Sequence, residues 1–424
     1  MGPSHSPVTI GLLGPWGSGN LGCATTQDAM IQNIHSRIPE AQIFGFSLNP
    51  ADTEAKHGIP SFHLSRANWS EYTHQQKSIS ERIGDWMHAH PSPVTLKMEL
   101  WVRRLPLEIG LIIQTYRHLK DFDLFIISGG GQLLDYWGKA WKQPYWLFKY
   151  ALLSKLAGTK FMFVSVGAGP IDGKISKLFI RAALFLASYR SYRDEDSKKY
   201  IERVLGFKKH DPVYPDLAYS IKLNGFQKTG SGRIVVGVGV MPYFDPRGWP
   251  ENDPIVYQTY LDKIASFVTW LVNQGYGINL LIGETIADRL VVKDLTCILK
   301  KAGVMSLANG QVKEEHIQSV SDLFCQISNT DFVVASRFHN VLLSTILNKP
   351  VIAISYHAKI DSLMKNSGQL HYCLPICQFT VETLKERFND LQADCESIQK
   401  QFEELTRVNR IALDEQYDRI FANL

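Results

Sequence analysis

Short apolar runs alternate with helical patterns along almost the whole chain. The apolar runs are rich in Val, Ile and Phe and are continuous, which is typical of strands in a parallel sheet covered on both faces. The predicted strands are Val8–Leu13, Ile43–Leu48, Leu124–Ser128, Lys160–Val166, Ser188–Tyr192, Arg233–Val240, Ile278–Ile282, Asp331–Ser336 and Val351–Ser355. The predicted helices include Ala24–Ser36, Tyr145–Leu156, Lys174–Ala187, Tyr257–Asn273, Ala287–Lys301 and Val381–Leu391. The pattern therefore predicts an α/β protein.

A polar stretch at Asn224–Gly232 divides this pattern in two. Its Gly, Ser and Thr residues are typical of a linker, and the length of 424 residues suits two domains at ~150 residues each. We predict two doubly wound parallel-sheet domains, residues 1–223 and 233–394, which face each other across a cleft. A less regular region at about 52–118 is predicted to be a helical insertion, and 395–424 a helix that could cross back to the first domain.

Charge and cysteine usage exclude several classes of protein. Lys plus Arg number 45 against 41 for Asp plus Glu, without a long basic tract, so we expect no nucleic-acid partner. The six cysteines are scattered, which favours reduced thiols in the cytoplasm. His371, Cys373 and Cys377 have an unusual spacing and no evident fourth ligand, so no metal is predicted.

The sequence also lacks the signals of export and of membrane insertion. Its start has no basic region followed by an apolar run, and no apolar stretch approaches the ~18 residues of a spanning helix. We expect a soluble cytoplasmic protein that at most contacts the inner face of the membrane. Residues 136–150 interleave aromatic and basic side chains; they could rest on a membrane or cradle a lipid-linked acceptor, but packing into a core is the favoured interpretation.

The end of the strand Asp331–Ser336 carries the clearest candidate chemistry. Arg337 and His339 follow it two residues apart, so strand alternation predicts that both side chains point the same way. Asn340 could cap the next helix, predicted at Val341–Leu347, whose free N–H groups attract anions. Ligands of parallel α/β sheets bind at the carboxyl ends of strands. These residues therefore predict a site for a small, highly charged anion.

Two further cations could join this site. Lys359 lies just beyond the strand Val351–Ser355 and would complete a cationic pocket with Arg337 and His339, although a solvated lysine and a structural histidine are alternatives. Arg193 follows another strand. It could be an anion ligand, or it could pair with Asp194 or Asp196.

Glycines cluster at three other strand ends. Gly17–Gly22 has the G-x-G-x-x-G spacing of dinucleotide sites, but no acid follows the second strand to hold a ribose, so a ligand-binding turn and a structural turn remain open. Ser128–Leu134 contains three consecutive glycines that permit close approach of backbone to ligand, and Gly167–Pro170 is similar. Tight packing or a hinge is the alternative. Together they suggest the floor of a cleft.

Several of these segments resemble, in order, the polysaccharide pyruvyl transferase family, which includes bacterial enzymes that modify cell-wall polysaccharides and exopolysaccharides. The resemblance covers about residues 8–365, and Ser336–His339 is its most specific part. The matching segments are Gly19–Gly22, Asp123–Gly131, Val166–Pro170, Arg193–Asp194, Pro215–Asp216, Ser336–His339 and Tyr356–Lys359. Cys23 departs from the pattern, because the family often has an acidic residue there.

The resemblance implies a GT-B-like fold without metal or cofactor, with phosphoenolpyruvate as donor and a sugar, which could be lipid-linked, as acceptor. Transfer would form a pyruvate ketal across two hydroxyls and release phosphate. Arg337 would hold the donor in a forked contact, His339 would transfer the proton, and Lys359 and Arg193 would offset charge on the phosphate. The residues expected on the acceptor side are Asn20, Gly22, Gly129, Gly130 and Gly131.

Two other functions remain open from the sequence. A nucleotide-sugar glycosyltransferase could use the same two-domain scaffold, because fold does not determine function. A non-catalytic saccharide-binding protein would need neither Arg337 nor His339 for glycan binding.

Overall fold

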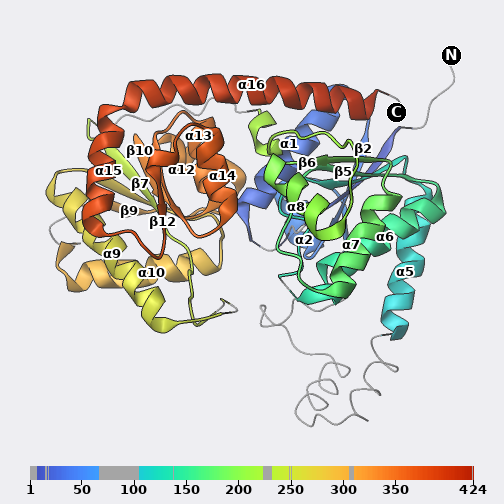
Figure 1. The fold of residues 1–424 in the computed structure, drawn as a ribbon, viewed down its shortest axis with the longest axis horizontal. Coiled ribbons are helices and arrows are strands. Elements are labelled where there is room, and N and C mark those ends of the chain that lie inside the picture. Colours follow the sequence, from blue (N-terminus) through green and yellow to red (C-terminus); the bar gives the residue numbers. More distant parts are fainter. Residues whose placement is uncertain are drawn as a thin grey trace, which may run out of the picture. The chain divides into compact units, whose positions relative to one another are not determined.

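The computed structural model describes residues 7–14, 17, 19–65, 105–136, 138–222, 232–247, 249, 251–304, 310–422 and 424. Most of the predicted insertion and nearly all of the predicted linker lie outside these residues. The chain forms two compact units (Figure 1). Unit 1 comprises residues 1–18, 30–216 and 416–424, and unit 2 comprises residues 19–29 and 217–415.

Unit 1 is built on a six-stranded parallel sheet of order β3-β2-β1-β4-β5-β6. Its strands are β1 (Thr9–Leu13), β2 (Gln42–Ser47), β3 (Ser61–His63), β4 (Leu124–Ser128), β5 (Lys160–Val166) and β6 (Tyr189–Tyr192). The helices that alternate with them are α1 (Leu21–Arg37), α2 (Pro50–His57), α5 (Leu105–Lys120), α6 (Gln143–Ala157), α7 (Lys174–Leu186) and α8 (Glu195–Leu205). Strand β4 is buried at every position, as continuous apolar sequence predicts.

Unit 2 repeats this topology. Its parallel sheet has the order β12-β11-β10-β7-β8-β9, with strands β7 (Val235–Gly239), β8 (Gly277–Leu281), β9 (Val312–Glu314), β10 (Phe332–Ala335), β11 (Val351–Ser355) and β12 (Cys373–Pro375). Its main helices are α9 (Pro254–Asn273), α10 (Ala287–Lys301), α12 (Val320–Ser328), α13 (Phe338–Ile346), α14 (Ala358–Asn366) and α15 (Val381–Ala393). Counted from β9, this is the strand order of the unit 1 sheet. Each sheet therefore reverses its winding once, between β1 and β4 and between β7 and β10.

Aromatic side chains fill both cores. In unit 1, Phe125 stacks on Tyr150 with ring centroids 5.3 Å apart, and Phe46 meets Phe125 edge-on at 5.0 Å. In unit 2, Phe267 and Phe332 contact Phe388, both at 5.6–5.7 Å. Because such rings combine large apolar area with preferred edge and offset geometries, they fix how helices lie on the sheets.

The last helix, α16 (Cys395–Phe421), contributes residues to both units. In unit 1, the buried Gln416 accepts a hydrogen bond from Ser165 Oγ at 3.0 Å and donates to Ser191 Oγ at 2.6 Å. Arg37 and Asp418 form an ion pair at 2.7 Å. The end of the chain is thus tied to β5 and β6 through side-chain amide and hydroxyl groups.

The predicted fold class is confirmed: the protein has two doubly wound parallel sheets with flanking helices. The nine predicted strands all occur with bounds within two residues of those observed. The short strands β3, β9 and β12 were not predicted. Among the residues that the structure describes, no helix has both the length and the apolar character needed to cross a membrane.

Candidate functional site

Four parallel strands of unit 2 end beside the residues of the candidate site. Arg337 follows β10, and Tyr356 and Lys359 follow β11. The segments 240–249 and 282–288 follow β7 and β8. Because these strands are neighbours in one parallel sheet, their carboxyl ends meet at one edge, where the winding reverses between β7 and β10.

Arg337 is held by a buried carboxylate that the sequence alone did not indicate. Its Nε donates to both carboxylate oxygens of Asp288, at 3.0 and 3.1 Å, and its Nη2 also donates to Asp288. Asp288 is fully buried and accepts two more hydrogen bonds, from the N–H groups of Gly283 and Glu284 at 2.8 and 2.9 Å. Such a fork fixes the plane of the guanidinium.

The charge of Arg337 is strongly stabilised. Burial by itself lowers the pKa of the guanidinium, but the adjacent Asp288 raises it by more, so the pKa lies above its ordinary value. Gly283 makes room for this side chain, because a β-carbon at position 283 would lie 3.2 Å from Arg337 Cγ. Arg337 is therefore a permanent positive charge in a defined orientation.

Helix α13 begins earlier than predicted, which changes the expected geometry. Arg337 has an extended backbone (φ −81°, ψ 132°) and is the N-cap residue, so Phe338 and His339 are already helical. The prediction that Arg337 and His339 point the same way assumed that both residues continue the strand. That assumption is wrong, because His339 is helical. Asn340 is not the cap either; it lies fully buried within the first turn of α13.

His339 packs against the first turn of α1. A β-carbon at Gly22 would overlap the imidazole ring of His339, so only glycine at position 22 leaves room for the ring. Residues 19–29 belong to unit 2, and Leu21 N–H donates to the carbonyl of Gly283 at 2.9 Å. The glycine segment that precedes α1 is thus part of the same site as His339.

Asn20 caps α1 with its side chain. Its Oδ1 accepts the N–H groups of Gly22 and Cys23 at 3.0 and 3.1 Å, and its backbone forms an antiparallel bridge with Glu284. Thr285 N–H donates to the carbonyl of Gly19 at 3.0 Å. The glycine turn before α1, for which the sequence allowed a ligand-binding or a structural role, therefore has a clear structural role. It holds the start of α1 beside Gly283 and Glu284.

Lys359 and Tyr356 form the second cationic part of the site. Lys359 Nζ lies 5.4 Å from the ring centroid of Tyr356 and 5.8 Å from that of Phe338. The ring of Trp249 meets that of Tyr356 edge-on, with the centroids 6.0 Å apart. Burial raises the pKa of Tyr356, but Lys359 and Arg337 together lower it by more, so the pKa lies below its ordinary value. The phenol is therefore more acidic than an ordinary tyrosine because of these two cations.

Glu284 is a second acid close to Asp288. Burial raises its pKa above the ordinary value, although its carboxylate accepts the N–H groups of Ile286 and Ala287 at the start of α10. Glu284, Asp288 and Tyr356 were missed as site residues. A signal for the two acids existed in the sequence, because they lie four residues apart directly after a predicted strand.

In unit 1, Arg193 is engaged by acids. Its Nε lies 3.3 Å from Asp194 and its Nη1 lies 3.6 Å from Asp216, with a side chain only 9% exposed. The alternative pairing with Asp194 is observed, and Asp216 is a further partner. A β-carbon at Gly167 would lie 2.8 Å from Arg193 Nη2. The guanidinium thus lies against the glycine-rich end of β5.

The two glycine-rich strand ends of unit 1 are neighbours, as expected from the sequence. Gly129 and Gly130 have positive φ angles of 56° and 67°. Gly167 N–H donates to the Gly130 carbonyl at 2.7 Å, and Leu133 N–H donates to the Gly167 carbonyl at 3.0 Å. Unit 1 therefore holds Arg193 and Gly129–Gly131, while unit 2 holds Arg337, His339 and Lys359 together with Asn20 and Gly22.

Comparison with solved structures identifies the class of fold. A glycosyltransferase from Rickettsia africae aligns with a TM-score of 0.55 and 10% identity, covering 99% of this chain and 100% of its own. The UDP-GlcNAc 2-epimerase from Methanocaldococcus jannaschii aligns with a TM-score of 0.51 and 11% identity, covering 91% of this chain and 92% of its own. At these identities the likeness concerns the fold alone, which is that of the GT-B glycosyltransferases and epimerases.

The family follows from the sequence. The model of the polysaccharide pyruvyl transferase family matches residues 20–358, which include every candidate site residue except Lys359. The chain belongs to the polysaccharide pyruvyl transferase family and is a transferase of polysaccharide biosynthesis. A comparison with curated proteins found no match.

Proposed function

We propose that this enzyme transfers the pyruvyl group of phosphoenolpyruvate onto two hydroxyls of one sugar, in a cell-surface polysaccharide or its lipid-linked precursor, on the cytoplasmic side of the membrane. The observation that carries the proposal is the pair Arg337–Asp288 beside Lys359, His339 and the start of α1. A doubly charged, compact donor with a phosphate and a carboxylate fits the cations gathered at one sheet edge.

Arg337 would bind the donor through the part of its guanidinium that Asp288 leaves open. Asp288 engages Nε and Nη2, and the N–H groups of Nη1 would donate to the phosphate or carboxylate of phosphoenolpyruvate. The buried carboxylate holds the fork in place before the donor arrives. Preorganised charges of this kind stabilise a transition state without reorganisation during the reaction.

The reaction requires one proton on the donor and one on the leaving group. His339 would protonate the methylene carbon, which becomes the methyl group, and a first sugar hydroxyl would add to the neighbouring carbon and return its proton to His339. The C–O bond to phosphate would then break, with Lys359 offsetting the charge. The second hydroxyl would close the ketal, and its proton would leave with inorganic phosphate.

In unit 2, the acceptor would lie against the start of α1 at Asn20 and Gly22, and in unit 1 the glycine-rich end of β4, Gly129–Gly131, is a second candidate for contact with the sugar. Glycine lets a sugar approach main-chain N–H and C=O groups closely, and the hydrogen bonds between Gly130 and Gly167 hold this backbone in one conformation. The proposed steps use no metal or cofactor, because His339 moves the proton of the first hydroxyl and phosphate takes the proton of the second.

The test is incubation of the purified enzyme with phosphoenolpyruvate and a panel of glycosides, following phosphate release and the mass of the acceptor. We expect one ketal-linked pyruvyl group per phosphate released. Parallel incubations with nucleotide sugars provide the comparison. Sugar transfer from a nucleotide without use of phosphoenolpyruvate would overturn the proposal, and so would glycan binding without any turnover.

The role of His339 needs its own comparison. His339→Ala is expected to lower turnover roughly 10²-fold or more, as for the loss of a general acid. His371→Ala is the matched control, because this unit 2 histidine has a side chain 54% exposed and pairs with Asp390. Normal turnover in His339→Ala would remove His339 from proton transfer.

A further inference from the structure

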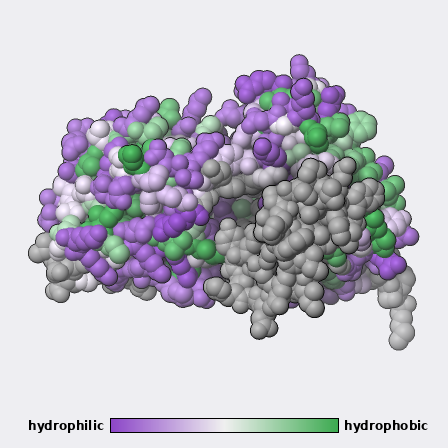
Figure 2. All heavy atoms as spheres, turned by 90° about the horizontal axis from the view of Figure 1, so that it is seen from below, coloured by the Kyte–Doolittle hydropathy of each residue, from purple (hydrophilic) through white to green (hydrophobic). Residues whose placement is uncertain are grey.

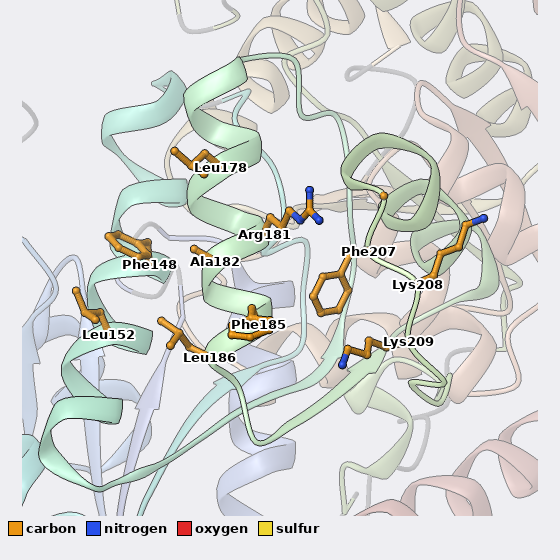
Figure 3. Close-up of a pocket in the computed structure, with 11 residues that line it drawn as sticks. Phe148, Leu152, Leu178, Arg181, Ala182, Phe185, Leu186, Phe207, Lys208 and Lys209 are labelled. Carbon is orange, nitrogen blue, oxygen red and sulfur yellow. The ribbon is translucent and has the colours of Figure 1, made fainter.

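A groove on unit 1 is lined by none of the residues assigned to the reaction above. It has a volume of about 590 Å³ and lies between α6, α7 and the segment Gly206–Lys209 that follows α8. Figure 3 shows Leu178, Arg181 and Phe185 on α7 and Leu152 on α6, with Lys208 and Lys209 on the segment that borders them. All of these residues belong to unit 1.

The walls of the groove expose large apolar side chains. Leu178 is 65% exposed and Phe185 is 73% exposed, and on α6 Leu152 is 37% exposed. Helix α7 also buries Ile180 and Leu184 completely, so it has apolar side chains on its exposed face as well as on the face that packs into the core. Figure 2 shows, in green, where hydrophobic residues reach the surface of the protein. Apolar residues that gather around one groove are a feature of interaction sites rather than of an ordinary surface.

The charged side chains that line the groove are basic: Arg181, Lys208 and Lys209. Helices α6 and α7 contain five basic residues and no Asp or Glu, although the whole chain has almost as many acidic as basic residues. Lys149 is buried against Glu108, whereas Lys155, Arg181, Lys208 and Lys209 are exposed. Among the residues that the structure describes, no acidic residue lines the groove.

We propose that this α6–α7 face docks onto an anionic phospholipid bilayer, with Phe185 and Leu178 entering the interface and Arg181, Lys208 and Lys209 contacting the headgroups. An amphipathic helix with Lys or Arg beside Phe and Leu is the arrangement that binds such a surface, and each added cation strengthens the attraction to anionic lipid. A second copy of the chain is a poorer occupant, because two basic faces would repel.

The structure also changes which residues are expected at the membrane. In the aromatic and basic stretch 136–150, Leu147 and Tyr150 are fully buried and Lys149 is 3% exposed, whereas Trp141 is 67% exposed, so the core interpretation fits only part of that stretch. The groove is lined by Phe148 and Leu152 of α6 and by α7. The docking proposal is independent of pyruvyl transfer, because none of its residues takes part in the proposed reaction.

The test is sedimentation of the full-length protein with vesicles. One set contains equal parts of phosphatidylglycerol and phosphatidylcholine, and the other contains phosphatidylcholine alone. We expect binding to the anionic vesicles at least roughly tenfold tighter than to the neutral ones, and weaker binding at high salt, since exposed charges are screened there.

Two variants and two matched controls locate the surface. Phe185→Ser and the double variant Lys208→Ala/Lys209→Ala are each expected to weaken binding to anionic vesicles roughly tenfold. The controls lie on unit 2: Ile255→Ser, at a residue 78% exposed, and Lys300→Ala/Lys301→Ala, at two adjacent exposed lysines. Both controls should bind as the wild type does.

Three results would overturn the docking proposal. The first is equal binding of the wild type to anionic and neutral vesicles, and the second is unchanged binding by both unit 1 variants. The third is a wild type that ignores vesicles and forms a dimer that Phe185→Ser dissociates, which would assign the face to a second copy. The urea unfolding midpoint, measured in parallel, shows that each variant is folded and keeps the outcome separate from that of the proposed reaction.

Discussion

Gly22 and His339 are packed so closely that a β-carbon at position 22 would overlap the imidazole ring. The two residues lie far apart in the sequence but in the same unit, where the start of α1 is hydrogen-bonded to Gly283. The side chain proposed to transfer the proton is therefore positioned by the absence of a side chain on another helix. This relationship gives the first prediction.

Gly22→Ala should displace His339 and damage both folding and turnover. We expect a loss of about 1–3 kcal/mol in the free energy of unfolding, the usual cost of overpacking, and a fall in turnover comparable to that of His339→Ala. Urea denaturation and phosphate release measure the two effects. Gly110→Ala is the control, because Gly110 is also helical but has open space around its Cα, and alanine there should stabilise by up to about 1 kcal/mol. Similar stability changes in both variants would contradict the prediction.

Asp288→Asn should leave the guanidinium of Arg337 without its counter-charge. Breaking a buried ion pair by removing one partner costs about 3–5 kcal/mol, so we expect a large drop in the urea midpoint and a raised KM for phosphoenolpyruvate. Asp294→Asn provides the comparison on the same helix, since Asp294 pairs with Arg247 and both side chains are about 40% exposed. Loss of that exposed pair should cost less than about 1 kcal/mol. Equal losses of stability in the two variants would show that the Asp288–Arg337 ion pair contributes no more than an exposed one.

Tyr356 should ionise before the other tyrosines with perturbed pKa values. Lys359 and Arg337 lower its pKa below the ordinary value of 10, whereas Tyr257 and Tyr260 have raised values. A pKa lowered by folding favours the ionised form, so this group stabilises the fold above the unfolded pKa, and that contribution is lost as pH falls through the folded pKa.

The titration is followed by tyrosinate absorbance. The wild type should show a phase below pH 10 that Tyr356→Phe removes and that Lys359→Met moves upward, because burial then dominates. Persistence of the early phase in Tyr356→Phe would assign it to another tyrosine.

Glu108 should matter for stability through the buried Lys149. Lys149 Nζ lies 2.9 Å from Glu108 Oε1, and the side chain of Lys149 is 2% exposed. Burial lowers the pKa of the lysine despite the nearby carboxylate. Glu108→Gln is expected to cost about 2–3 kcal/mol, because it leaves an ammonium group buried. Lys149→Met/Glu108→Gln should recover most of that loss, and a double-mutant cycle in urea measures it. Additive effects of the two single changes would contradict the coupling.

Local sequence patterns predicted most of the fold but few of the contacts within the site. Continuous apolar runs identify strands such as β4 and β11 because buried parallel strands need no polar face. Strands β3, β9 and β12 have three residues each, which is too short for any periodicity. The start of α13 was misplaced because the extended backbone of Arg337 ends the strand and begins the helix at once.

The partners of the site residues depend on contacts between distant segments. Asp288 and Arg337 are 49 positions apart, and nothing in either local pattern predicts their pairing. Arg337, His339 and Lys359 could be named because they follow predicted strand ends and match the family pattern. The sequence could not predict that Asn20 and Gly22 belong to unit 2. Their placement depends on hydrogen bonds between Leu21 and Gly283 and between Gly19 and Thr285.

The shared strand order of the two sheets has a consequence for how this enzyme could diversify. Each sheet reverses its winding once, and the strand ends at the two reversals differ: the end of β10 carries the Arg337–Asp288 ion pair, whereas the end of β4 carries three consecutive glycines. Changes of side chain along the glycine-rich end of β4 could then alter which sugar is accepted while the donor chemistry at the end of β10 is left intact. Acceptor range and donor chemistry would then evolve on two different sheets that share one strand order.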